Sequence, residues 1–210
     1  MLSEQFDALL AKIGNPTLAH PVFYACPVAL RFALGPSSAE VPTFLGSDKD
    51  RTANPAYVAA ALDRAGAIYR VLPQPPNLLR IDCFPPERDA QPPAWSRLQT
   101  ILPPPHERRD TRSDDEEDAV TQLYWALDRE HFTPDSLLRE IVCADLGGAF
   151  PFLASSVCFA STEAAILYHV YDDRGADLAA ASVETLRPIY HRLNDWLLDN
   201  DRAAMDDLFA

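Results

Sequence analysis

Residues 166–177 constrain the fold of this chain most strongly. The segment Ile166–Tyr171 runs without a break through apolar and aromatic residues, with His169 as its polar member. A strand that is apolar on both alternating faces is typical of the centre of a sheet that is covered on both sides. The segment Asp172–Gly175 follows at once, and its carboxylates and glycine favour a turn in which Gly175 adopts a positive φ. The sequence therefore predicts a buried central strand that ends at a charged turn.

The charge of the chain narrows the range of partners. The 210 residues carry a formal net charge of −13, and a surface this acidic repels the phosphates of nucleic acids and suits a basic protein partner. We find no signal peptide and no apolar run of about 18 residues that could span a membrane, so we expect a cytoplasmic protein without membrane contact. The cysteines at 26, 83, 143 and 158 form no C-x-x-C pair, which favours reduced and mostly buried thiols.

Hydrophobic periodicity and turn residues predict one α+β domain over residues 1–210. Helices are expected at 3–13, capped by Ser3, at 54–72, opened by Asn54 and a proline, and at 133–145. A last long helix should follow Gly175 and present Trp196 on its buried face, with Thr185 as the cap that makes Pro188 tolerable. Short helices are expected near 94–102 and at 202–209. Strands are expected at 28–34, 78–84, 120–127, 157–160 and 166–171, with a polar loop at 36–54. The predicted architecture is an antiparallel or mixed sheet packed by about three longer helices.

An acidic segment interrupts this pattern. Residues 103–118 begin with three prolines and end in a run of carboxylates, which predicts a mobile, solvated loop. The same run could instead be a docking segment for a basic partner, in which case the binding residues are Asp114, Asp115, Glu116, Glu117 and Asp118.

Three stretches of the chain resemble one known family. The run Tyr171–Gly175 with Asp177 is similar to a Y-D-D-R-G-x-D signature, Leu30–Gly35 is similar to an L-R-F-E-L-G strand, and Ile189–Asp199 is similar to a C-terminal helix of the same family. The family is the bacterial domain of unknown function DUF3885. The resemblance implies a bacterial, cytosolic α+β domain and no activity. Ala33 stands where the family usually has glutamate.

The charged turn supplies the best candidate site. Asp172, Asp173, Arg174 and Asp177 bring three carboxylates and a guanidinium together, and such oxygens could bind Mg²⁺ or Ca²⁺ or act as a general base. The spacing of an EF-hand is absent, so we assign no metal site. The alternative is scaffolding, in which one aspartate closes the turn and Arg174 bridges the acids to a helix end or to the strand that holds Arg31.

Isolated polar residues add weaker candidates. Arg31, on a predicted strand, could bind an anionic group or form a buried ion pair with the aspartates. His169 should be a hydrogen-bonded core histidine. His191 and Asp195 could form an acid–base pair, although an exposed helix pair is commoner.

These features favour binding over catalysis. We find no P-loop, dinucleotide-binding or hydrolase motif, and no cofactor site. The leading hypothesis is a bacterial cytosolic protein-binding domain, an inhibitor of immunity type that neutralises a basic toxin or effector. The alternatives are an enzyme, either a hydrolase or a transferase, or a ligand-sensing module. Both would use the cluster Asp172, Asp173, Arg174 and Asp177.

Overall fold

The computed structural model describes residues 1–18, 21–47, 49–83, 98–111, 120–146 and 155–210. One seven-stranded sheet in the order β1-β9-β8-β7-β4-β6-β5 organises these residues, and all its neighbouring strands pair antiparallel. The strands are β1 (Ala29–Ala33), β4 (Leu78–Cys83), β5 (Glu107–Thr111), β6 (Val120–Ala126), β7 (Ser155–Ser161), β8 (Ile166–Val170) and β9 (Gly175–Ala180). The predicted single α+β domain is confirmed.

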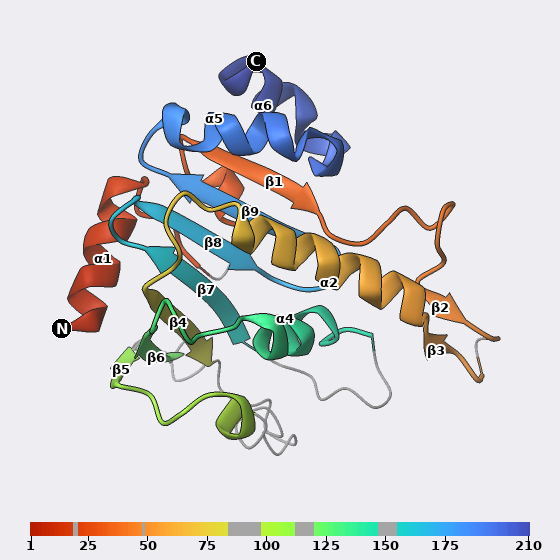
Figure 1. The fold of residues 1–210 in the computed structure, drawn as a ribbon, viewed down its shortest axis with the longest axis horizontal. Helices are drawn as coiled ribbons and strands as arrows, with labels where there is room; N and C mark the ends of the chain where they lie inside the picture. The colour runs from red at the N-terminus through yellow and green to blue at the C-terminus, as the bar shows by residue number, and fades with distance from the viewer. Residues whose placement is uncertain (19–20, 48, 84–97, 112–119, 147–154) are drawn as a thin grey trace.

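Helices cover both faces of the sheet (Figure 1). The described helices are α1 (Leu2–Lys12), α2 (Pro55–Arg70), α4 (Asp135–Val142), α5 (Val183–Arg192) and α6 (Arg202–Phe209). Short 3-10 helices are η1 (Val22–Tyr24), η3 (Asn194–Trp196) and η4 (Asp199–Asp201). Among the described residues, no helix combines the length and the apolar character that a membrane crossing requires.

The central strand β8 behaves as its sequence predicts. All five of its residues are buried, and it pairs with β7 on one side and β9 on the other. Tyr168 belongs to the larger core under α2, α4 and α5, whereas Leu167 belongs to the smaller core under α1. The alternation of side chains along a strand therefore places His169 on the α1 face of the sheet.

The start of α2 also follows the prediction. Pro55 opens the helix, and the Asn54 side chain accepts a hydrogen bond from the Ala56 N–H at 3.0 Å. The start of α1 does not, because the helix begins at Leu2 and places Ser3 inside its first turn. The Ser3 hydroxyl donates a hydrogen bond to Glu107 on β5 instead of capping the helix.

Two strands of the seven-stranded sheet lie where the sequence predicted none. β9 occupies the start of the expected last helix, and it inserts between β1 and β8 with every residue buried. β5 lies inside the expected mobile loop at 103–118, so that prediction is wrong for Glu107–Thr111. The acidic run Asp114–Asp118 lies outside the described residues. The short hairpin of β2 (Phe44–Leu45) and β3 (Thr52–Ala53) replaces part of the expected loop at 36–54.

The C-terminal region departs from one long helix. α5 begins after Ser182 rather than at Thr185, contains Pro188, and ends at Arg192. Trp196 therefore lies in η3, where its side chain is half-buried against the larger core instead of fully buried. Leu197 then forms an isolated β-bridge with Phe32, so this segment of the chain covers the outer edge of β1.

Candidate functional site

The turn between β8 and β9 is closed by Asp172. Its carboxylate is buried and accepts hydrogen bonds from the Arg174 backbone N–H and Nε, both at 2.7 Å. Arg174 also forms an ion pair with Asp145 at 3.2 Å, just beyond the end of α4. The predicted bridge from the acidic turn to a helix end is thereby confirmed. The Arg174 side chain is 74% exposed, so solvent weakens the ion pair.

Gly175 serves this turn by its lack of a side chain. Among the described glycines, Gly14 and Gly46 have a positive φ, and Gly175 does not, so the expected left-handed conformation is wrong. A Cβ at Gly175 would lie 2.7 Å from the Tyr171 ring. The glycine therefore makes room for Tyr171 rather than relieving backbone strain.

Asp173 points toward α2. Its carboxylate is buried and accepts a hydrogen bond from the Tyr57 hydroxyl at 2.7 Å. Burial raises the pKa of Asp173 and, together with the neighbouring carboxylate, raises the pKa of Tyr57 to about 12. Gly35 gives the hydroxyl space, because a Cβ there would lie 2.1 Å from it. The contact ties the turn to α2.

Asp177 lies on β9, beyond the turn, and faces the opposite side of the sheet. It is fully buried, accepts a hydrogen bond from the Tyr171 hydroxyl, and accepts another from the Phe23 N–H in η1 at 3.0 Å. Burial raises the pKa of Asp177 to about 6, even though the hydrogen bonds and Arg31 favour the ionised form.

The predicted cluster therefore does not form one site. Asp172 closes the turn with Arg174, Asp173 binds Tyr57 of α2, and Asp177 binds η1 and β1. Within the described parts of the chain, no group of three His, Cys, Asp or Glu side chains could hold a metal ion.

Asp177 belongs to a row of polar side chains on the α1 face of the sheet. We call this row the polar stripe, and its members are Arg31, Arg80, Asp82, Gln122, Ser156, His169 and Asp177. All are buried except Arg31, whose side chain is 16% exposed. The register of the sheet aligns them, because His169 pairs with Asp177, Asp177 with Arg31, and Asp82 with both Ser156 and Gln122. Sequence reasoning missed most of this row, since its members come from six strands.

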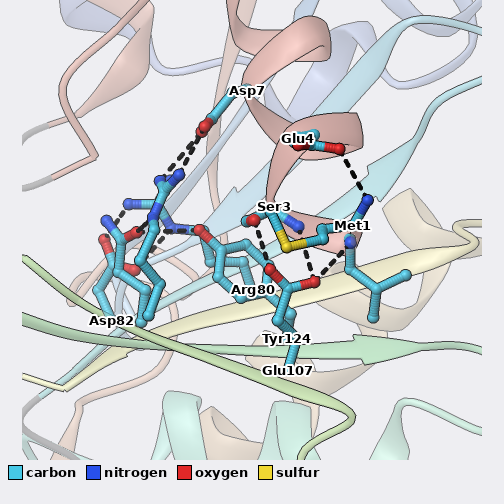
Figure 2. Close-up of polar contacts among 11 residues, drawn as sticks. Met1, Ser3, Glu4, Asp7, Arg80, Asp82, Glu107 and Tyr124 are labelled. Carbon is cyan, nitrogen blue, oxygen red and sulfur yellow. Dashed lines mark hydrogen bonds and ion pairs between the residues drawn. The ribbon is translucent and has the colours of Figure 1, made fainter.

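One end of the polar stripe anchors helix α1 (Figure 2). Arg80 forms two hydrogen bonds with Asp82 at 2.6 and 2.7 Å, and its guanidinium lies 5.2 Å from the centre of the Phe6 ring. On β5, Arg109 binds Asp7 of α1 at 2.6 Å. Figure 2 also shows Glu107 facing the first turn of α1. These contacts fix the helix on the sheet, which is a structural role.

The middle of the polar stripe holds the predicted core histidine. His169 is 3% exposed, and its Nε2 lies 2.9 Å from the Ser156 hydroxyl. Its Nδ1 is buried without a hydrogen-bond partner in the structure. Burial lowers the pKa of His169 to about 4, so the imidazole is neutral at pH 7. The histidine is thus buried as predicted, but only half of its hydrogen-bonding capacity is used.

The other end of the polar stripe reaches the surface at Arg31. Its guanidinium forms an ion pair with Asp177 at 3.7 Å, which confirms the predicted pair with the aspartate cluster, and a second ion pair with Asp201 of η4 at 3.3 Å. It also lies 4.9 Å from the centre of the Tyr24 ring. The Tyr24 hydroxyl donates to Asp201 at 3.1 Å, and the Tyr24 side chain remains 65% exposed. We call Tyr24, Arg31 and Asp201 the Tyr24 surface.

The remaining predicted candidates do not join these groups. His191 and Asp195 are exposed and lie in different elements, α5 and η3. An apolar cavity of about 360 Å³ lies beside Trp125, lined by Leu98, Leu102 and three prolines among others, and it contains none of the candidate residues.

Comparison with known families gives one match. The model of the family described as "Domain of unknown function (DUF3885)" matches residues 6–201. The chain belongs to this family. The DUF3885 match includes both Tyr24 and Asp201, and therefore the whole Tyr24 surface. No curated protein and no solved structure matches the chain. The DUF3885 description states no activity, so function has to be argued from the geometry.

Proposed function

We propose that this DUF3885 protein is a binding domain that contacts a basic protein through the Tyr24 surface. The observation that carries the proposal is an exposed tyrosine whose position is fixed. Tyr24 is held by Asp201, by the Arg31 guanidinium, and by an edge-on contact with the Phe23 ring at 5.3 Å. A rigid, exposed tyrosine loses little entropy on binding, and tyrosines are enriched at the energetic centres of interfaces.

The charge of the chain selects the kind of partner. Asp199 and Asn200 of η4 are exposed beside Asp201, and the whole chain carries a net charge of −13. Carboxylates around an aromatic anchor complement a basic surface and speed its association. We infer that the partner is a basic toxin or effector and that binding neutralises it. The protein would then be an immunity-type inhibitor that acts in the bacterial cytoplasm.

The alternative of an enzyme or ligand sensor built on the charged turn gains no support. Asp172 and Arg174 pair with each other to close the turn, whereas Asp173 and Asp177 have separate partners and face opposite sides of the sheet. A shared substrate could not contact both carboxylates.

Site-specific photo-crosslinking tests the proposal. A photoreactive phenylalanine analogue replaces Tyr24 in one strain and Leu45 in a matched control, because Leu45 is also exposed but lies on the distant β2–β3 hairpin (Figure 1). We expect a defined basic protein to be captured from position 24 and not from position 45. Equal capture from both positions, or capture from neither, would contradict the proposal.

The captured protein then allows the inhibitor hypothesis to be tested. Expressed alone, it should slow growth, and co-expression of the wild-type chain should restore growth. Tyr24→Ala should weaken binding at least about tenfold, as expected for an anchor residue. Asp50→Lys, a charge reversal on the β2–β3 hairpin, is the control and should bind normally. If the captured protein does not slow growth, the proposed binding role still stands but the proposed inhibitor role is rejected.

A further inference from the structure

The Tyr24 surface is mechanically connected to a carboxylate in the protein interior. Arg31 contacts Asp177 on its inner side and Asp201 on its outer side. Asp177 also accepts the Phe23 N–H, and Phe23 directly precedes Tyr24 in η1. Two independent contacts therefore lead from one buried side chain to the exposed tyrosine: the Arg31 bridge and the backbone of η1.

Several elements surround Asp177, and groups from most of them affect its ionisation. The groups that face it are the Tyr171 hydroxyl, the Phe23 N–H and the Arg31 guanidinium. The Asp201 carboxylate acts on it from η4, the Cys26 thiol interacts with it from the segment after η1, and His169 is its partner across the β8–β9 pair. Burial outweighs the favourable contacts and brings the pKa of Asp177 to about 6.

Proton binding would change both contacts that lead to Tyr24. A neutral carboxyl group no longer attracts Arg31 as an ion, and it accepts the Phe23 N–H more weakly than a carboxylate does. His169 stays neutral in the same pH range, because its own pKa is lowered to about 4, so it supplies no compensating charge. Arg31 would then keep Asp201 as its acidic partner within the Tyr24 surface.

We propose that Asp177 is a proton-sensitive latch: when it is ionised it holds η1 and the Tyr24 surface in the binding conformation, and when it is protonated the surface loosens and the basic partner is released. The release of a partner rests on the proposed function. The coupling between Asp177 and Tyr24 does not, since it follows from contacts within the chain.

Nuclear magnetic resonance tests the coupling without any partner. The amide shifts and the hydrogen-exchange protection factors of Phe23 and Tyr24 are measured from pH 5 to 8 in the wild type and in Asp177→Asn, which mimics the neutral acid. We expect the wild-type Phe23 shift to titrate near pH 6 and its protection to fall at least about tenfold at low pH. Asp177→Asn should show the loosened values at every pH.

Two further variants locate the coupling. Asp172→Asn removes a nearby buried carboxylate that does not contact η1, and it should titrate like the wild type. Asp201→Asn should loosen Tyr24, and the Phe23 shift should still titrate, at a somewhat lower pH because the Asp201 charge that helps to raise the pKa of Asp177 is removed. The coupling is wrong if the Tyr24 protection factor is the same at pH 5 and pH 7 in the wild type. That comparison also decides the matter if Asp177→Asn does not fold.

Crosslinking from position 24 at pH 7 and pH 5 tests the release of the partner. Capture that falls at least about tenfold at pH 5 supports the latch. Equal capture at both pH values, with a loosened surface, would reject release. Absence of capture at pH 7 with an intact coupling would reject the proposed function and leave the coupling standing, so the two failures are distinguishable.

Discussion

Two buried groups of the polar stripe should change the stability of the protein with pH in opposite directions. The pKa of His169 falls from 6.5 to about 4 on folding. Below pH 6.5 the unfolded chain binds a proton at His169 that the folded chain does not bind. The contribution of His169 to the free energy of unfolding is therefore present above pH 6.5 and is lost as the pH falls toward 4. The pKa of Asp177 rises from 3.8 to about 6. The folded chain therefore keeps a proton that the unfolded chain has released, and stability from this group increases as the pH falls from 6 toward 3.8.

The sizes of the two effects follow from these pKa values. Between pH 7 and pH 5, the His169 contribution lowers the free energy of unfolding by about 2 kcal/mol. Over the same interval, the Asp177 contribution raises it by about 1 kcal/mol. The two contributions partly cancel in the wild type, so substitution of each residue is needed to measure them separately.

The two contributions can be separated by measuring urea unfolding of His169→Gln and Asp177→Asn at pH 5 and pH 7, with circular dichroism as the signal. The destabilisation caused by His169→Gln should be smaller at pH 5 than at pH 7 by about 2 kcal/mol, because the variant lacks the acid-sensitive imidazole. The destabilisation caused by Asp177→Asn should be larger at pH 5 by about 1 kcal/mol.

The control is Asp63→Asn, which changes an exposed carboxylate on α2 and should have the same effect at both pH values. Differences between variants also remove the contributions of all other titrating groups. If the destabilisation caused by His169→Gln is independent of pH, His169 is not a buried neutral imidazole and the reasoning fails.

Three further substitutions test the packing, each by its effect on the free energy of unfolding. Gly35→Ala should cost about 1–3 kcal/mol, because the new methyl group meets the Tyr57 hydroxyl, and a wild-type melting temperature would contradict this contact. Trp196→Ala should cost about 1–3 kcal/mol and clearly less than Phe209→Ala, since Trp196 is half-buried and Phe209 is fully buried; the reverse order would place Trp196 in the core. Arg174→Lys should cost less than about 1 kcal/mol and leave crosslinking from position 24 unchanged, because the side chain is 74% exposed, and lost capture at an unchanged melting temperature would make Arg174 a binding residue.

The sequence predicted correctly those helices and strands whose formation depends mainly on neighbouring residues. The apolar run of β8 and the proline-started helix α2 fall where expected. β9 was missed because Gly-Ala-Asp-Leu-Ala-Ala has the composition of a helix start, and only its burial between β1 and β8 makes it a strand. Tertiary pairing overrides propensity there.

Some contacts of the candidate site could likewise be predicted from the sequence, and others could not. Arg31 on a predicted strand was expected to form an ion pair with the aspartate cluster after β8, and the pair with Asp177 exists. Asp201 could not be found, since its partner Arg31 is 170 residues away in the sequence. Ser156 was missed because the predicted strand began at residue 157, one residue after it. Asp173 and Asp177 are close in sequence but point to different faces of the sheet, so their closeness along the chain wrongly suggested a shared site.

The strand order has a consequence for how the protein is made. β1 pairs with β9, so Ala29 meets Ala179 from a distant part of the sequence, and Leu197 covers the outer edge of β1. A ribosome must therefore synthesise every residue up to β9 before β1 finds its place in the sheet. Folds dominated by such distant pairings form slowly, and their unpaired edges are exposed to aggregation in the meantime. We expect nascent chains that end before β9 to depend on chaperones, because β1 then has no strand to join.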